Sequence, residues 1–174
     1  MPTPTYTLIA SSTVGSGGAA DITFSSISSS YTDLVLKISM RTNRSSNIDP
    51  VQIQFNGDTG SNYSYRSIWS DASGTVNSFN SGAPDRIDAQ YSTAATATAN
   101  TFTNFEIYIP NYASSNQKST SYDSAHEDNS STAFLVMMAN RWTGTAAINS
   151  IKMDPINGNF VQYTTAYLYG IVSS

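Results

Sequence analysis

Apolar residues recur at every second position in several stretches of the chain. In the stretch 34–41 the even positions are apolar, and the odd positions become polar after Val35. The odd positions of 51–55 are apolar, and so are those of 103–109 after Thr103. Successive side chains of a strand point to opposite faces, so a strand with one buried face requires this period. The pattern predicts strands in these stretches.

Two stretches carry aromatic residues on one side. In 162–171 one face holds Tyr163, Thr165, Tyr167, Tyr169 and Ile171. In 63–69 one face holds Tyr63, Tyr65 and Trp69, and Arg66 lies on the other. One of these stripes must belong to the core. A second, exposed stripe would be a platform for sugar rings or for a partner subunit.

Weaker strand signals and frequent turns fill the rest of the chain. The further strands are expected at Tyr6–Ile9, Asp21–Phe24, Tyr63–Trp69, Arg86–Tyr91, Lys118–Ala125 and Ala147–Met153. Glycine-rich turns separate them at 15–18, 56–58, 81–84 and 157–159. Many short strands indicate a sandwich or barrel rather than alternating strands and helices. The prediction is an all-β fold, an antiparallel jelly-roll-like sandwich, although an immunoglobulin-like strand order shares this pattern.

One stretch has two interpretations. Residues 131–138 fit either the start of a capped helix or a central strand buried on both faces. The strand is favoured because the neighbouring stretches all resemble strands. The stretch 92–101, rich in Ala and Thr, is expected to be a loop that leads to a strand at Phe102.

The chain is expected to form one domain. Residues 6–174 would make a single β-sandwich, and no linker divides them. Residues 1–5 contain two prolines and are expected to form an extended N-terminal arm, which adds an edge strand or lies on a neighbour. The N-terminal stretch has no basic region followed by an apolar run, so synthesis in the cytoplasm without a secretory signal is expected.

The composition excludes several classes of partner. Only 11% of the 174 residues are charged, against about 25% in ordinary soluble domains. The net charge is −4 and no basic block occurs, so binding to nucleic acid or to an anionic membrane is not expected. The chain has no cysteine, which excludes disulfides and thiolate chemistry.

No catalytic, cofactor-binding or metal-binding residue is predicted. The only histidine, His126, is expected in an exposed loop, and no nucleophile elbow occurs. A convergence of Asp85, Asp88 and Glu106 would supply the paired carboxylates of a glycosidase, but isolated, solvated turn residues are the simpler interpretation. The stretch 56–62 has oxygen-bearing residues at alternate positions but lacks the closing Glu of a calcium loop, and a tight glycine turn explains it.

Several stretches resemble a family of virion-associated proteins of tailed phages, in particular of cyanophages. The stretches that carry the resemblance are 6–10, 31–36, 53–64, 107–112 and 168–171. The resemblance runs along nearly the whole chain and rests on strand and turn patterns, so it specifies a fold better than an activity. It implies a capsid decoration (cement) protein, commonly a jelly-roll trimer that caps threefold positions of the shell, or an appendage of the fibre or knob type.

The expected function is therefore that of a non-enzymatic virion protein on the outer capsid surface. It would assemble with itself, as a homotrimer, bind the major capsid protein and stabilise the shell. The alternative is a receptor- or carbohydrate-binding module of a head or tail fibre, with host surface glycan as its partner. A glycan hydrolase is the third and weakest hypothesis.

The residues predicted to form the interaction surface come from the arm and from the aromatic positions. They are Pro2, Thr3, Pro4, Tyr63, Tyr65, Trp69 and Trp142. Exposure of these aromatic residues together in one groove would favour the carbohydrate-binding alternative.

Overall fold

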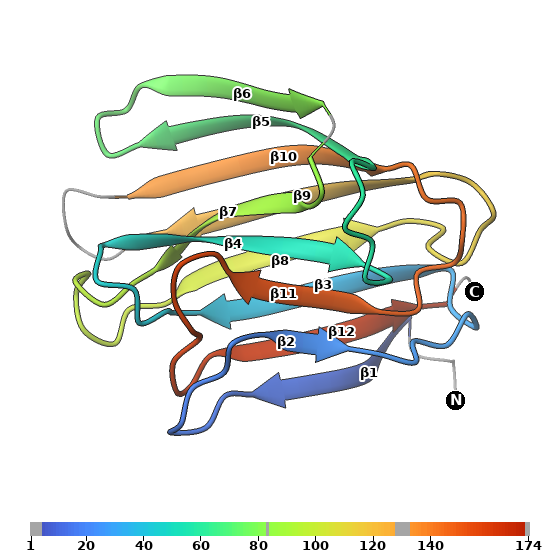
Figure 1. The fold of residues 1–174 in the computed structure, drawn as a ribbon, viewed down its shortest axis with the longest axis horizontal. Coiled ribbons are helices and arrows are strands. Elements are labelled where there is room, and N and C mark those ends of the chain that lie inside the picture. Colours follow the sequence, from blue (N-terminus) through green and yellow to red (C-terminus); the bar gives the residue numbers. More distant parts are fainter. Residues whose placement is uncertain (1–4, 83, 128–132, 173–174) are drawn as a thin grey trace.

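A computed structural model of the chain contains two antiparallel β-sheets packed face to face, with no helix among the residues it describes (Figure 1). It describes residues 5–82, 84–127 and 133–172, and of residues 89 and 90 the backbone alone. The predicted all-β sandwich is confirmed.

The larger sheet has eight strands and the smaller sheet has four. In spatial order the larger sheet contains β1 (Tyr6–Thr13), β12 (Thr165–Ile171), β3 (Asp33–Met40), β8 (Thr103–Ile109), β9 (Lys118–His126), β10 (Phe134–Trp142), β5 (Tyr63–Asp71) and β6 (Val76–Gly82). The smaller sheet contains β2 (Ile22–Phe24), β11 (Ile151–Pro155), β4 (Ile48–Phe55) and β7 (Ile87–Thr93). The chain passes repeatedly between the sheets, which is compatible with a jelly-roll-like sandwich.

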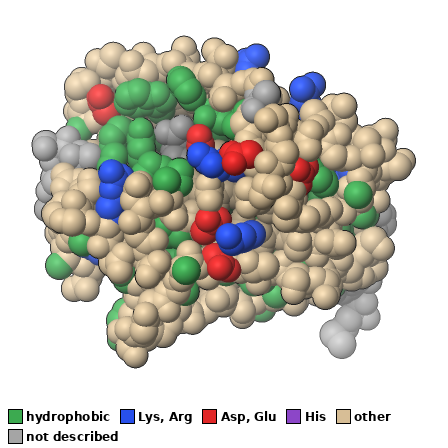
Figure 2. Space-filling model, in the orientation of Figure 1, with side chains coloured by type: hydrophobic (Ala, Val, Ile, Leu, Met, Phe, Trp, Pro, Cys, Tyr) green, Lys and Arg blue, Asp and Glu red, His purple; other side chains and the backbone are tan. Residues whose placement is uncertain are grey.

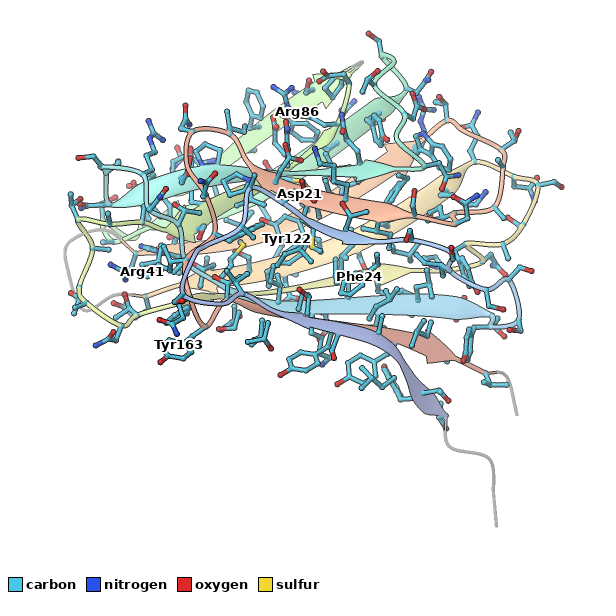
Figure 3. All side chains as sticks on the ribbon, turned by 60° about the horizontal axis from the view of Figure 1, so that its bottom comes forward. Asp21, Phe24, Arg41, Arg86, Tyr122 and Tyr163 are labelled. Carbon is cyan, nitrogen blue, oxygen red and sulfur yellow. The ribbon has the colours of Figure 1, made fainter. Side chains whose placement is uncertain are left out.

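A single apolar cluster fills the space between the two sheets. The predicted alternation sets its membership, because the even positions of β3 and the odd positions of β4 and β8 are buried. In Figure 3 Tyr122 of β9 and Phe24 of β2 point into this space, and both are buried. The period of the sequence thus predicted which side of these strands faces the core.

Within the stretch 131–142 the structure has the strand Phe134–Trp142, which pairs along its length with β5 and β9. The prediction that this strand is buried on both faces is wrong. Leu135 is 57% exposed and Met137 is 55% exposed, whereas Val136 and Met138 are buried. The reason is that the smaller sheet covers only one face of the larger sheet, so the other face of β10 has no layer over it.

The sequence pattern did not predict one strand, β6. Its residues, VNSFNSG, are mostly polar, and the stretch 81–84 was interpreted as a turn. The strand forms because its backbone completes a ladder with β5, from Ser70 opposite Val76 to Ser64 opposite Gly82. The connecting turn contains Gly74 at a φ of 76°, a conformation that glycine adopts without strain.

The predicted loop is confirmed from residue 94 onward, since β7 extends to Thr93. The Arg41 guanidinium holds this loop by donating hydrogen bonds to the carbonyl oxygens of Thr98 and Thr101, both at 2.9 Å. Residues 1–4 of the predicted arm lie outside the described residues. The carbonyl of Thr5 accepts a hydrogen bond from the Val172 amide at 3.2 Å, next to the end of β12.

Candidate binding groove and exposed apolar faces

The larger sheet extends beyond the smaller one at the β6 end. Figure 1 shows β6 lying beyond β7, the nearby edge strand of the smaller sheet. Phe79 of β6 points to the same side of the sheet as the buried Ser67 of β5, yet it is 53% exposed. The inner face of β6 is therefore open to solvent beside β7.

A groove of about 420 Å³ follows this open inner face, and we call it the overhang groove. Its aromatic lining comes from Tyr65 and Trp69 of β5, Phe79 of β6 and Tyr91 of β7. The Tyr65 and Phe79 ring centroids are 5.9 Å apart. Figure 2 shows hydrophobic side chains gathered in a hollow on this side of the molecule. Rings from both sheets thus meet in one open groove.

Charged residues occupy one end of the overhang groove. The Tyr65 hydroxyl donates to Asp88 Oδ2 at 2.9 Å, and the Arg86 Nε donates to Asp88 Oδ1 at 3.2 Å. Arg86 also donates to Asp85 Oδ1 at 3.0 Å. Burial and the hydrogen bond to Asp88 raise the pKa of Tyr65 to about 12. The polar groups therefore hold each other in defined positions.

Three of the aromatic residues predicted to form an interaction surface are buried. Tyr63, Tyr65 and Trp142 are buried, because they lie on the strand faces that point toward the smaller sheet. The Tyr63 and Trp142 rings stack with centroids 6.5 Å apart. Of the four predicted aromatic residues only Trp69 is partly exposed, and Tyr65 contributes to the lining of the overhang groove. Pro2, Thr3 and Pro4 lie outside the described residues.

The second aromatic stripe is exposed. On β12 the side chains of Ala166 and Leu168 enter the core, so Tyr167 and Tyr169 lie on the outer face of the larger sheet. The Tyr6 ring on β1 meets the Tyr169 ring edge to face, with centroids 6.2 Å apart. Tyr163, just before β12, is 68% exposed and points away from the molecule in Figure 3. The expectation that one stripe is core is confirmed, and the other provides an exposed tyrosine surface.

A second apolar surface lies at the opposite end of the same outer face. We call it the outer aliphatic patch, and it consists of Ile68, Val76, Leu135 and Met137. Ile68 and Met137 stand directly opposite each other on paired strands, and Val76 is 72% exposed. These side chains surround a shallow hollow of about 110 Å³. Contiguous apolar surface of this kind usually marks a contact site.

The structure separates the candidate carboxylates. Glu106 lies on the outer face of the larger sheet, where it forms an ion pair with Lys37 at 2.6 Å. Asp85 and Asp88 lie beside Arg86 at the edge of the smaller sheet. The convergence of Asp85, Asp88 and Glu106 considered for a glycosidase is therefore absent among these described side chains.

His126 is not in an exposed loop, and that expectation was wrong. It ends β9 and is buried, because even positions of this strand face the smaller sheet. Its Nδ1 lies 3.0 Å from the Thr93 hydroxyl and 3.1 Å from the Thr103 hydroxyl. These contacts connect the ends of β7, β8 and β9, which is a structural role.

The stretch 56–62 is a turn, as the glycine interpretation predicted. Asn56 and Gly57 both have positive φ, 55° and 66°. The Asp58 carboxylate accepts hydrogen bonds from the Trp142 indole at 2.7 Å and from the Gly60 amide at 2.8 Å. Among the described residues no group of three or more His, Cys, Asp and Glu side chains is placed to hold a metal ion.

No protein-family model, no curated protein and no solved structure matches the chain. Within the described part of the chain, no helix is long and apolar enough to span a membrane.

Proposed function

We propose that the protein is a non-enzymatic structural subunit of a tailed-phage virion, which associates with its own copies and binds the outer surface of the capsid shell. The phage assignment rests on the sequence resemblance. The observation that supports association most directly is the outer aliphatic patch, which continues onto the unpaired edge strand β6. Obligate interfaces bury apolar surface and are depleted in charge, and this surface has both properties.

The edge of β6 lacks the usual protection against pairing. Exposed edge strands normally carry charge, proline, a bulge or very short length. The edge strand β2 has three residues, and β1 contains an irregularity between Leu8 and Ala10. The edge strand β7 carries Asp88 and follows Arg86. In contrast, β6 has seven residues without charge or proline and shows no bulge in its pairing with β5.

A second copy of the chain is the partner that suits this edge. Two β6 strands related by a two-fold axis would pair antiparallel and join the two larger sheets. Residues near such an axis meet their own copies, so a strand without charge avoids repulsion between like charges. The homotrimer implied by the resemblance would instead pair β6 with a different edge of its neighbour. In the two-fold arrangement the outer aliphatic patches of the two copies lie side by side on one continuous outer face.

The experiment measures the molar mass of the protein by light scattering coupled to size-exclusion chromatography, over a range of protein concentrations. We expect a dimer or trimer for the wild-type protein, and a monomer for the double variant Val76→Lys, Ser78→Lys, because charge on β6 opposes pairing. The matched control is Ser119→Lys, an exposed residue of the same outer face on β9, which should leave the mass unchanged. A wild-type protein that remains monomeric at the highest concentration would contradict the proposal.

The virion assignment requires its own measurement. The number of copies and the position of the protein in purified phage particles would provide it. We expect hundreds of copies over the head surface, in contact with the major capsid protein. A dozen or fewer copies at a vertex or at the tail tip would instead assign the protein to a fibre.

A further inference from the structure

We propose that the overhang groove is a binding site for a carbohydrate chain. The site lies on the inner side of β5 and β6, opposite the outer aliphatic patch, and its ligand is tested separately from the proposed self-association. The argument rests on the shape of the groove, on its aromatic side chains and on its polar end.

The dimensions of the groove suit a sugar chain. Its volume of about 420 Å³ lies within the range of roughly 300–1,000 Å³ for small-molecule sites. The overhang leaves the groove open along its length, because β6 has no opposing strand in the smaller sheet. An open groove admits an internal segment of a chain, whereas a closed pocket admits only an end.

The aromatic side chains provide apolar surfaces of the required kind. Trp69 and Phe79 come from the overhanging strands, and Tyr91 comes from β7 across the groove. Trp69 and Tyr91 are partly exposed, and both rings are supported from behind by Phe134, at centroid distances of 5.9 Å and 5.0 Å. A pyranose ring has an apolar C–H face that packs on such rings while its hydroxyl groups remain free for hydrogen bonds.

The polar end provides partners for those hydroxyl groups. A sugar hydroxyl both donates and accepts, and Arg86 and Asp88 offer a donor and an acceptor side by side. Their orientation is already fixed by the hydrogen bonds among Tyr65, Arg86, Asp88 and Asp85. Side chains that are held in place before binding lose little conformational entropy when the ligand arrives.

The charges of the groove favour a neutral ligand. Asp85 and Asp88 surround Arg86, so the carboxylates would repel a phosphate or sulfate group. An extended peptide is the competing occupant, because β6 and β7 are both edge strands. A neutral glycan fits better, because a peptide would need hydrogen bonds along a strand edge, whereas the groove is lined by aromatic rings and one polar cluster.

The test is titration with cellohexaose, maltohexaose and chitohexaose, followed by tryptophan fluorescence and by calorimetry. The chain has two tryptophans, so the variant Trp142→Phe leaves Trp69 as the only indole fluorophore. We expect at least one hexasaccharide to change the Trp69 emission at saturable, micromolar to millimolar concentration. A lack of binding to all three sugars by both methods would overturn the proposal.

Variants localise the binding. Trp69→Ala and Arg86→Gln should each weaken binding by about tenfold or more, whereas Tyr167→Ala, which removes an exposed tyrosine on the opposite face of the molecule, should have no effect. If Trp69→Ala destabilises the fold, Phe79→Ala serves instead, because that ring is already half exposed. Affinity that is unchanged in the Arg86 and Phe79 variants, or a peptide of random sequence that competes equally well, would overturn the proposal.

Discussion

At the scale of single residues, Asp58 connects two distant parts of the chain. Its carboxylate accepts a hydrogen bond from the Trp142 indole, which lies within the core beside Phe55 and Tyr63. The same carboxylate accepts from Gly60 and Asn62 within its own turn. One partly buried turn residue therefore holds the indole of Trp142 in its position in the core.

We expect Asp58→Ala to lower the free energy of unfolding by about 1–3 kcal/mol, because it leaves the buried indole N–H of Trp142 without a partner. Urea denaturation followed by tryptophan fluorescence would measure the change. Asp123→Ala, which removes an exposed carboxylate on β9, is the matched control and should be nearly neutral. Equal effects of the two substitutions would contradict the role given to Asp58.

The same carboxylate predicts a dependence of stability on pH. Burial raises the pKa of Asp58, but the hydrogen bonds from Trp142, Gly60 and Asn62 outweigh it and hold the pKa below the ordinary value. The contribution to stability is therefore complete above the unfolded pKa of about 4, and it is lost as the pH falls through the lower, folded pKa. We expect stability to decrease on acidification in this range, and to decrease less in Asp58→Asn. Parallel pH profiles for the two proteins would contradict this.

Residue-level burial could be predicted only where one face of a strand was clearly polar. The alternation of Val51, Ile53 and Phe55 with polar residues identified the buried side correctly. In β12 both faces contain apolar residues, so the sequence did not reveal that Tyr167 faces outward. That choice depends on which face the other sheet covers, and no local pattern contains this information.

At the scale of elements, the overhanging β5–β6 hairpin is the least supported part of the larger sheet. The strand β6 pairs on one side only and has no layer against either face. Local openings of such segments require less free energy than opening of the core. The sequence pattern did not predict this strand, because its Asn, Ser and Gly residues are typical of turns. Only the backbone ladder with β5 makes it a strand.

Hydrogen exchange measured by mass spectrometry should detect this difference. In dilute protein we expect the amides of Val76–Gly82 to exchange faster than those of Phe134–Trp142, a strand that is paired on both sides. In concentrated protein we expect protection of the β6 amides to rise, since pairing with a second copy would engage the free edge. Exchange in β6 that does not depend on concentration would count against pairing through this edge.

At the scale of the whole molecule, the two-layer architecture and the inequality of the two sheets explain the two candidate surfaces. The smaller sheet packs on one side only, so the outer face of the larger sheet is uncovered, and four strands cannot cover eight, so one end of its inner face is uncovered as well. The sequence predicted a sandwich from many short strands, but it could not predict how the strands divide between the sheets. That division depends on pairings between residues far apart in the chain, such as Ser11 with Tyr167.

The position of β12 has a consequence for how the protein is made. In the larger sheet β12 lies between β1 and β3, and it pairs with both of them. A ribosome delivers β1 and β3 long before β12, so neither strand has this neighbour until β12 has been made. The larger sheet can therefore be completed only after translation has passed Ile171. Until then, the growing chains on one messenger RNA would expose the unpaired edges of β1 and β3 to each other.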